Sequence, residues 1–318
     1  MRSPLLFLSA ALATVIVAAC SSNDAAPPPT APPTTTEAPI PGIPEEETPA
    51  PVVAKDGGPQ VQPESKGCAV APKGAGTIAK QATTAATKAR AYHLAVPTGV
   101  KTKQALPLVF VLHGAGDTAP QNMHDWFAVD ATMGRATLTV FPQALPRTRS
   151  DGSGGNIPRW DLSGNEDLAF FDAMLAELSD TYCVDRAHVF VTGFSSGGNF
   201  SQHLACLRQK DVKGMGVVAG PGPFTDTCSG AVPVWMTHDA DDNALPVKDA
   251  RSSRDFWAAE NGCGTSAWAV VPGRPECKRN TACPADAPLV YCETTGVGHD
   301  VPAFAVASIG EFFGSLLK

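Results

Sequence analysis

The sequence predicts an α/β fold over residues 67–318, with a mostly parallel, doubly wound sheet and helices on both faces. Two observations support this prediction. Short, continuously apolar runs recur along the segment, and such runs are typical of strands buried on both faces. A helical pattern lies between two of the runs, and strand, helix and strand in this order form the unit of a doubly wound sheet. The expected strands are 108–112, 137–141, 188–192, 215–219, 232–237 and 289–292.

The clearest helical pattern follows Ser163. Ser163 and Glu166 have the spacing of a capping box, in which each side chain bonds the backbone N–H of the other residue. Apolar residues then recur at spacings of three and four, so they share one helical face. We therefore expect a helix here whose apolar face consists of Leu168, Phe171, Leu175, Leu178 and Tyr182.

The N-terminal part of the chain differs in composition from the rest. Residues 1–19 carry one positive charge and an apolar run, which is the pattern of a secretory signal peptide. Small residues precede Cys20, and this segment resembles a bacterial lipoprotein leader. The resemblance implies that Cys20 is acylated and anchors the protein to a membrane, and the alternative is an ordinary cleaved signal. Residues 20–66 are rich in Pro, Thr, Ala and Glu and predict a disordered tether.

The negative charge of the chain is concentrated in this tether. The formal net charge is −7, to which the leader contributes +1 and the tether −5, leaving −3 for residues 67–318. A folded domain with so little net charge offers no basic surface to a polyanion. We therefore expect no nucleic-acid partner.

Eight cysteines remain when Cys20 is set aside. An even number in an exported chain suggests four disulfides, although the residues alone leave the pairing open. A zinc site is the alternative interpretation. Zinc is disfavoured because the close pair Cys277 and Cys283 has no neighbouring histidine and no second close pair. We expect four disulfides and no metal.

The expected strand 188–192 runs directly into Gly-Phe-Ser-Ser-Gly at 193–197, and a helix-compatible segment follows. In this context G-x-S-x-G is typical of a nucleophile elbow, a sharp turn that raises the serine hydroxyl above the sheet edge. The alternative is a glycine-rich turn without chemistry. We interpret Ser195 as a nucleophile and the backbone N–H of Ser196 as one donor of an oxyanion hole.

A serine nucleophile needs a general base, because its hydroxyl is hardly ionised at neutral pH. If the chain order is nucleophile, acid, histidine, the candidates are His238 and His299. We favour His299, which lies in a short turn after the expected strand 289–292. The acid should follow a strand between Ser195 and His299, which leaves three carboxylates open: Asp239, Asp241 and Asp242. Two of the three are expected at the surface or in turns, because three buried neighbours would raise one another's pKa values.

A second oxyanion donor is expected in the turn that follows the strand 108–112. His113 is followed there by Gly114 and Ala115, and a turn of such small residues can bring a backbone N–H close to the nucleophile. We interpret His113 itself as a structural residue. None of this chemistry needs a metal or an organic cofactor.

Several blocks of the chain resemble the secreted α/β-hydrolase esterases, which include feruloyl esterases and polyhydroxybutyrate depolymerase-like proteins. The resemblance extends over roughly two thirds of the chain. The blocks that carry it are residues 90–94, 96–97, 107–109, 113–114, 160–161, 167–170, 182–185, 238–246, 256–257, 261–263 and 296–299.

The resemblance implies an α/β-hydrolase fold and a monomeric, exported serine esterase, with a feruloyl ester on plant polysaccharide as the leading substrate. The alternatives are a polyhydroxyalkanoate or short-acyl ester and, from another class, a carbohydrate-binding lipoprotein without activity. Residues 238–246 are similar to the motif H-G-x-x-D-x-x-V-P, which selects Asp242 as the acid. Asp239 stands where that motif has Gly, and Val301 where feruloyl esterases commonly have Trp. Trp160 is then the aromatic residue expected to line the substrate site, and the alternative is that it is a core residue.

The resemblance also implies a disulfide scheme. It pairs Cys263 with Cys292 and Cys277 with Cys283. The remaining cysteines would then form Cys206–Cys228 and Cys68–Cys183.

Overall fold

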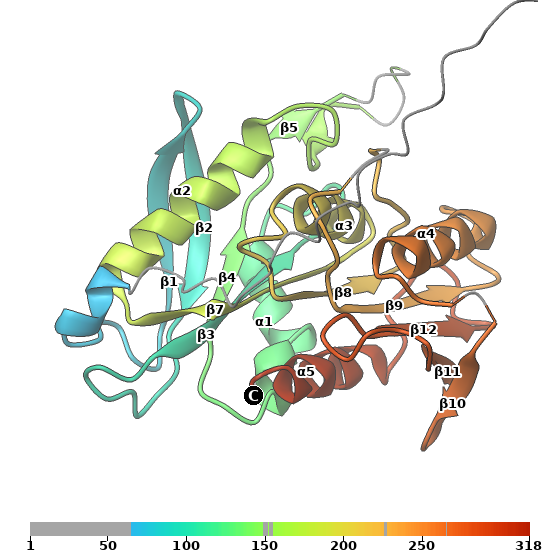
Figure 1. Cartoon of the computed structure of the whole chain (residues 1–318). Helices are drawn as coiled ribbons and strands as arrows, with labels where there is room; N and C mark the ends of the chain where they lie inside the picture. The colour runs from blue at the N-terminus through green and yellow to red at the C-terminus, as the bar shows by residue number, and fades with distance from the viewer. Residues whose placement is uncertain (1–64, 149–151, 153–154, 226–227, 265) are drawn as a thin grey trace, which may run out of the picture. The chain divides into compact units, whose positions relative to one another are not determined.

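The computed structural model describes residues 65–148, 152, 155–225, 228–264 and 266–318 (Figure 1). The expected signal peptide, Cys20 and nearly all of the expected tether lie outside the described residues. Within the described ranges, no helix is both long enough and apolar enough to cross a membrane.

A ten-stranded sheet forms the centre of the domain, in the order β1-β2-β4-β3-β7-β8-β9-β12-β11-β10. Its central strands run parallel, and each contains or overlaps one of the apolar runs predicted from the sequence. The prediction of a mostly parallel sheet is therefore confirmed. The parallel strands are β3 (Leu106–Leu112), β4 (Leu138–Pro142), β7 (Val184–Phe194), β8 (Gly214–Val218), β9 (Val234–Asp239) and β12 (Leu289–Thr294).

Antiparallel strands that were not predicted extend the sheet at both ends. One end carries β1 (Ile78–Ala85) and β2 (Lys88–Ala95), and the other carries β11 (Arg274–Asn280) and β10 (Trp268–Val271). Many of their residues are exposed, so these strands lack the continuous apolar runs of the central ones. A separate small ladder pairs β5 (Pro146–Arg147) with β6 (Ile157–Pro158).

Helices cover both faces of the sheet. One face packs against α2 (Glu166–Thr181), α3 (Ser196–Leu207) and α4 (Val247–Glu260). The other face packs against α1 (Met123–Trp126) and α5 (Ala305–Ser315). Three short 3₁₀ turns complete the described elements: η1 (Lys66–Ala69), η2 (Pro120–Asn122) and η3 (Val129–Thr132).

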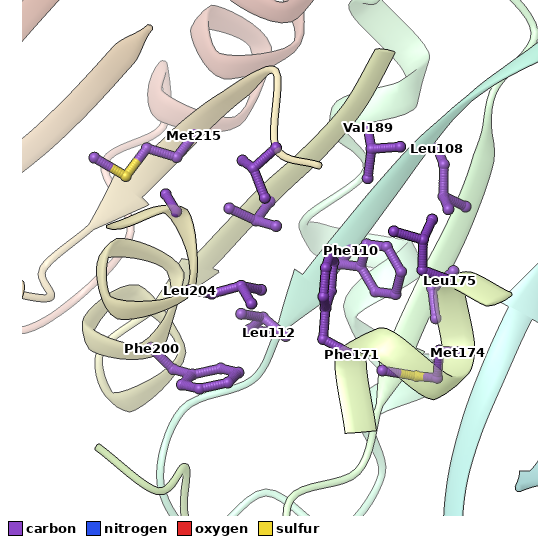
Figure 2. Packing of buried hydrophobic residues seen from close by; sticks show 14 of the residues in the cluster. Leu108, Phe110, Leu112, Phe171, Met174, Leu175, Val189, Phe200, Leu204 and Met215 are labelled. Carbon is purple, nitrogen blue, oxygen red and sulfur yellow. The ribbon is translucent and has the colours of Figure 1, made fainter. Parts of the chain in front are cut away.

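Strand β3 shows how the sequence divides between the two faces. Leu108, Phe110 and Leu112 point toward α2 and α3, as Figure 2 shows, whereas Val109 and Val111 belong to the cluster around α5. Successive side chains of a strand point to opposite faces, so a strand between two helical layers must be apolar at every position.

Helix α2 begins at Glu166 and does not use the expected capping box. The N–H and the hydroxyl of Ser163 both donate to Oδ1 of Asp161, at 3.1 Å each. The Glu166 carboxylate forms ion pairs with Lys88 and Arg147. The two halves of the box thus have other partners. The partner of Ser163 lies two residues before it in the chain, whereas those of Glu166 come from other segments. The expected apolar face is buried, with no member more than 8% exposed.

The described residues form four disulfides. Cys68–Cys183 and Cys206–Cys228 are the pairs that the resemblance implies, but the other two pairs differ from it. Cys277 bonds Cys292, and Cys263 bonds Cys283. The implied pairs Cys263–Cys292 and Cys277–Cys283 are therefore wrong. The reason is strand register, because Cys277 of β11 lies directly opposite Cys292 of β12, with their Cα atoms 3.9 Å apart.

A buried ion pair joins β2 to α2. Arg90 and Asp167 have fully buried side chains, and their nitrogen and oxygen atoms are 2.7 Å apart. The Arg90 guanidinium also lies 3.9 Å above the ring of Phe170 and donates to the carbonyl oxygen of Gln143. Burial lowers the pKa of Arg90, and the contact with Asp167 opposes this shift by favouring the charged form.

We predict that Asp167→Asn lowers the free energy of unfolding by ~3–5 kcal/mol, because it leaves a buried guanidinium without its counter-charge. The matched control is Asp172→Asn on the same helix. Asp172 pairs with Arg208 at 2.9 Å but is 46% exposed, so its loss should cost less than ~1 kcal/mol. Urea unfolding curves measure both values, and equal losses would contradict the prediction.

Candidate active site

Ser195 lies on a strained turn between β7 and α3. Its backbone has φ 54° and ψ −120°, a conformation that residues with a side chain rarely adopt. A Cβ on Gly197 would lie 1.9 Å from the carbonyl oxygen of Leu112, and one on Gly193 would lie 2.6 Å from the same atom. Glycine is therefore required at both flanking positions, which gives the G-x-S-x-G pattern a steric reason.

Ser195, His299 and Asp242 form one hydrogen-bonded chain. Nε2 of His299 is 2.9 Å from Oγ of Ser195, and Nδ1 of His299 is 2.7 Å from Oδ2 of Asp242. An ionised carboxylate can only accept, so Nδ1 carries the proton and Nε2 is free to accept one from the serine hydroxyl. The structure thus brings together the three residues that the sequence and the resemblance selected, from loops that follow β7, β9 and β12.

The Asp242 carboxylate is buried but well satisfied. Its Oδ1 accepts hydrogen bonds from the backbone N–H groups of Ala244 and Leu245, at 2.8 and 2.9 Å. Burial alone would raise the pKa of Asp242, but the hydrogen bonds from His299 and from these N–H groups outweigh it and hold the pKa below its ordinary value. The side chain is therefore charged at neutral pH and suited to stabilise an imidazolium.

His238, the other candidate base, contacts the acid rather than the serine. Its Nε2 is 2.7 Å from the carbonyl oxygen of Leu245 and 3.3 Å from Oδ2 of Asp242. Because a carbonyl oxygen only accepts, Nε2 of His238 carries a proton. His238 therefore lies on the side of Asp242 and presents its N–H to that carboxylate. Of the two histidines, the geometry favours His299 as the base, because His299 is the one that contacts Ser195.

The burial of the three neighbouring acids differs from the expectation that two of them lie at the surface or in turns. Asp241 is exposed, but Asp239 and Asp242 are only 2% and 7% exposed. Burial would raise the pKa of Asp239, but hydrogen bonds from the Thr294 hydroxyl and from several backbone N–H groups hold it below its ordinary value. Each of the two buried carboxylates accepts several hydrogen bonds. These bonds stabilise the charged forms, so both charges are tolerated close together.

The turn that was expected to supply an oxyanion donor lies beside the nucleophile. A Cβ on Gly114 would be 3.6 Å from the Cβ of Ser195. His113 fixes this turn, because Ala144 donates its N–H to Nε2 at 3.0 Å, which leaves the proton on Nδ1 to bond the carbonyl oxygen of Gly114 at 2.7 Å. Burial also lowers the pKa of His113 and favours this neutral form. The roles of the N–H groups of Ser196 and of Gly114 or Ala115 stay predictions.

Trp160 is largely buried beside the candidate site. Its side chain is 4% exposed and stacks on Phe200, with ring centroids 5.1 Å apart and an interplanar angle of 5°. The indole N–H donates to the carbonyl oxygen of His113 at 2.9 Å and so braces the turn at 113–114. The backbone N–H of Trp160 donates to Oγ of Ser196 at 3.4 Å, and contact of Trp160 with substrate stays a prediction.

An open cleft of about 340 Å³ adjoins the His299 loop. Thr294, Val297 and Pro302 belong to its lining, and Phe304 supplies an aromatic side chain. Neither Ser195 nor His299 is among the described residues that line this cleft. Within the described part of the chain, no group of three or more His, Cys, Asp or Glu residues is arranged to hold a metal.

No protein-family model matches the chain. Among curated proteins it is 27% identical to a probable feruloyl esterase C of Aspergillus clavatus over 227 residues, covering 69% of this chain and 79% of the relative. It is 29% identical to feruloyl esterase C of Emericella nidulans over 181 residues, covering 55% of this chain and 63% of that relative. It is 37% identical to feruloyl esterase D of Neurospora crassa over 116 residues, covering 36% of this chain and 40% of that relative. The chain thus spans less than two thirds of the last two relatives.

Solved structures show the same fold. The acetyl xylan esterase from Aspergillus awamori has a TM-score of 0.53 and 15% identity, covering 74% of this chain and 99% of that one. A ferulic acid esterase from Anaeromyces mucronatus has a TM-score of 0.51 and 14% identity, covering 76% and 92%.

Fold, site and relatives together define a class of protein, the carboxylic ester hydrolases with an α/β-hydrolase fold. Within that class, the chain is similar to the feruloyl esterases.

Proposed function

We propose that this chain is an exported serine esterase that cleaves aromatic esters of plant polysaccharide through an acyl-enzyme. The observation that carries the proposal is the hydrogen-bonded chain from Ser195 through His299 to Asp242 on a strained elbow. Nucleophile, base and orienting acid in this geometry are the parts that acyl transfer requires.

The mechanism follows from which atoms hold the protons. The Ser195 hydroxyl attacks the ester carbonyl while its proton passes to Nε2 of His299, and Asp242 stabilises the imidazolium that forms. Backbone N–H groups of Ser196 and of Gly114 or Ala115 bind the oxyanion. His299 then returns the proton to the departing alkoxide as the C–O bond breaks. In the second half, His299 deprotonates a water that attacks the acyl-enzyme, which releases the acid and regenerates Ser195.

The similarity to feruloyl esterases supports an ester linked to plant polysaccharide. Val301 stands where feruloyl esterases commonly carry an aromatic residue close to the histidine.

That replacement favours one second candidate, an esterase for short acyl groups or polyhydroxyalkanoates. A smaller side chain at Val301 suits a narrow, flexible acyl chain as well as a flat ring. The two candidates share the same catalytic residues and differ in the acyl group that the site accepts.

Export and anchoring are also part of the proposal. The leader pattern before Cys20 and the four disulfides in the described residues support an oxidising compartment outside the cytosol. We propose that acylated Cys20 anchors a monomer to a membrane and that residues 21–66 hold the esterase domain away from it.

We predict that Ser195→Ala lowers the rate of p-nitrophenyl acetate hydrolysis to at most about 10⁻³ of the wild-type rate, because the nucleophile is lost. The control is Ser252→Ala on α4, an exposed serine whose hydroxyl only bonds the carbonyl oxygen of Lys248. It should hydrolyse the ester at the wild-type rate. Equal activity in all three proteins would reject catalysis and favour a binding protein on this scaffold.

Acyl specificity is tested by comparing methyl ferulate with a 3-hydroxybutyrate oligomer. We expect the higher kcat/KM with methyl ferulate, measured as released ferulic acid by chromatography. Cleavage of the oligomer without release of ferulic acid would transfer the assignment to the second candidate.

Anchoring is tested in a bacterial host that processes lipoproteins. We expect the wild-type chain in the membrane fraction and Cys20→Ser in the soluble fraction, because the substituted residue cannot carry the lipid. Immunoblots of the separated fractions report the distribution, and the same distribution for both chains would argue for an ordinary cleaved signal.

A further inference from the structure

The loop that carries His299 has little side-chain packing of its own. Gly296 and Gly298 adopt φ values of +77° and +72°, and a Cβ on either would meet no atom within 4 Å. Thr295 and Val297 are exposed. A loop of this kind is free to move unless hydrogen bonds hold it, yet the imidazole must stay between nucleophile and acid for proton transfer.

Asp239 supplies hydrogen bonds that restrain this loop. Its Oδ2 accepts from the hydroxyl of Thr294 at 2.7 Å and from the backbone N–H of Val297 at 3.0 Å. Its Oδ1 accepts the N–H of Asp241 at 2.9 Å, which ties the same carboxylate to its own turn. The side chain is 2% exposed, so these charge-assisted bonds lie out of water, where they are strongest.

Asp241 adds a second, weaker contact between the same two segments. Its Oδ2 accepts the N–H of Gly296 at 2.8 Å, but the side chain is exposed. Together with Asp242, which accepts from His299, these acids bind four groups of the segment 294–299. The turn after β9 thus holds both the imidazole and the backbone that presents it.

We propose that Asp239 is a positioning residue for the proposed esterase reaction, because its buried carboxylate fixes the loop 294–298 and thereby the place of His299. The inference rests on the proposed function. It assigns a role to the residue at which this chain departs from the motif that residues 238–246 resemble. The hydrogen bonds of Asp239 go to Thr294, Val297 and Asp241, and none goes to Ser195 or His299, so it acts on the site through the loop.

The direct test is Asp239→Asn, which keeps the size of the side chain but removes its charge. The amide also places an N–H donor against groups that only donate, namely the backbone N–H of Val297 or of Asp241. We expect kcat for p-nitrophenyl acetate to fall about 10²-fold, the effect of misplacing a catalytic group by about 1 Å, with KM within about twofold of wild type. The rate at which a fluorophosphonate labels Ser195 should fall in parallel, because labelling needs the same base.

The matched control is Asp300→Asn in the same loop. Asp300 is exposed and bonds only the N–H of its neighbour Val301, at 2.7 Å. It should keep the wild-type kcat, KM and labelling rate. Thermal unfolding of each variant separates a local change in the loop from a loss of the fold.

A second variant decides the matter if Asp239→Asn does not fold. Thr294→Val removes the hydroxyl that donates to Oδ2 of Asp239 at 2.7 Å, while the size of the side chain is kept and Asp239 stays charged. We expect kcat to fall about fivefold with KM unchanged, the effect of losing one hydrogen bond of ordinary strength.

Wild-type kcat and labelling rate in a folded Asp239→Asn would overturn the inference, as would a rise in KM with no fall in kcat. If Asp239→Asn does not fold, wild-type kcat in Thr294→Val would overturn it instead. Failure of the proposed function looks different, because the wild-type chain would then be no more active than Ser195→Ala. A wild-type esterase whose kcat is insensitive to Asp239 contradicts only the positioning role.

Discussion

The close approach of backbone to backbone at the start of α3 is the constraint on which the site depends. Gly197 lies against the carbonyl oxygen of Leu112, and a Cβ on Gly220 would lie 2.5 Å from the backbone nitrogen of Asn199. No side chain fits between the first turn of the helix and the ends of β3 and β8. The helix is therefore seated directly on the sheet edge, and Ser195 is forced into the strained conformation that presents its hydroxyl.

The remaining site residues are held by hydrogen bonds to backbone groups rather than by apolar packing. Asp242 accepts two backbone N–H groups as well as His299, and Asp239 accepts two backbone N–H groups and a hydroxyl. This supply of donors allows two carboxylates to be buried on one turn without losing their charge. On the other side of Ser195, Trp160 and His113 brace the turn at Gly114 in the same way. A site of this kind is preorganised, since its dipoles and charges are in place before any substrate arrives.

Local patterns in the sequence were enough to predict the central strands of the sheet and part of the candidate site. Burial on both faces makes a central strand apolar throughout, so all the parallel strands were visible as continuous runs. Ser195 was visible because the two glycines that its turn requires, Gly193 and Gly197, lie within five consecutive residues. The edge strands were missed, because a strand such as β1 is largely exposed and has no continuous apolar run.

The sequence by itself determined a parallel α/β core with a serine elbow and a histidine further along the chain, because periodicity and turn chemistry are properties of neighbouring residues. Spacing alone could not choose among Asp239, Asp241 and Asp242, and a resemblance was needed to select the last. Only the tertiary structure decided the burial of Asp239, the partners of Cys277 and Cys263, and the place of Trp160 in the core. Each of these depends on contacts between segments far apart in the sequence, such as the register of β11 against β12, and no local pattern encodes such a contact.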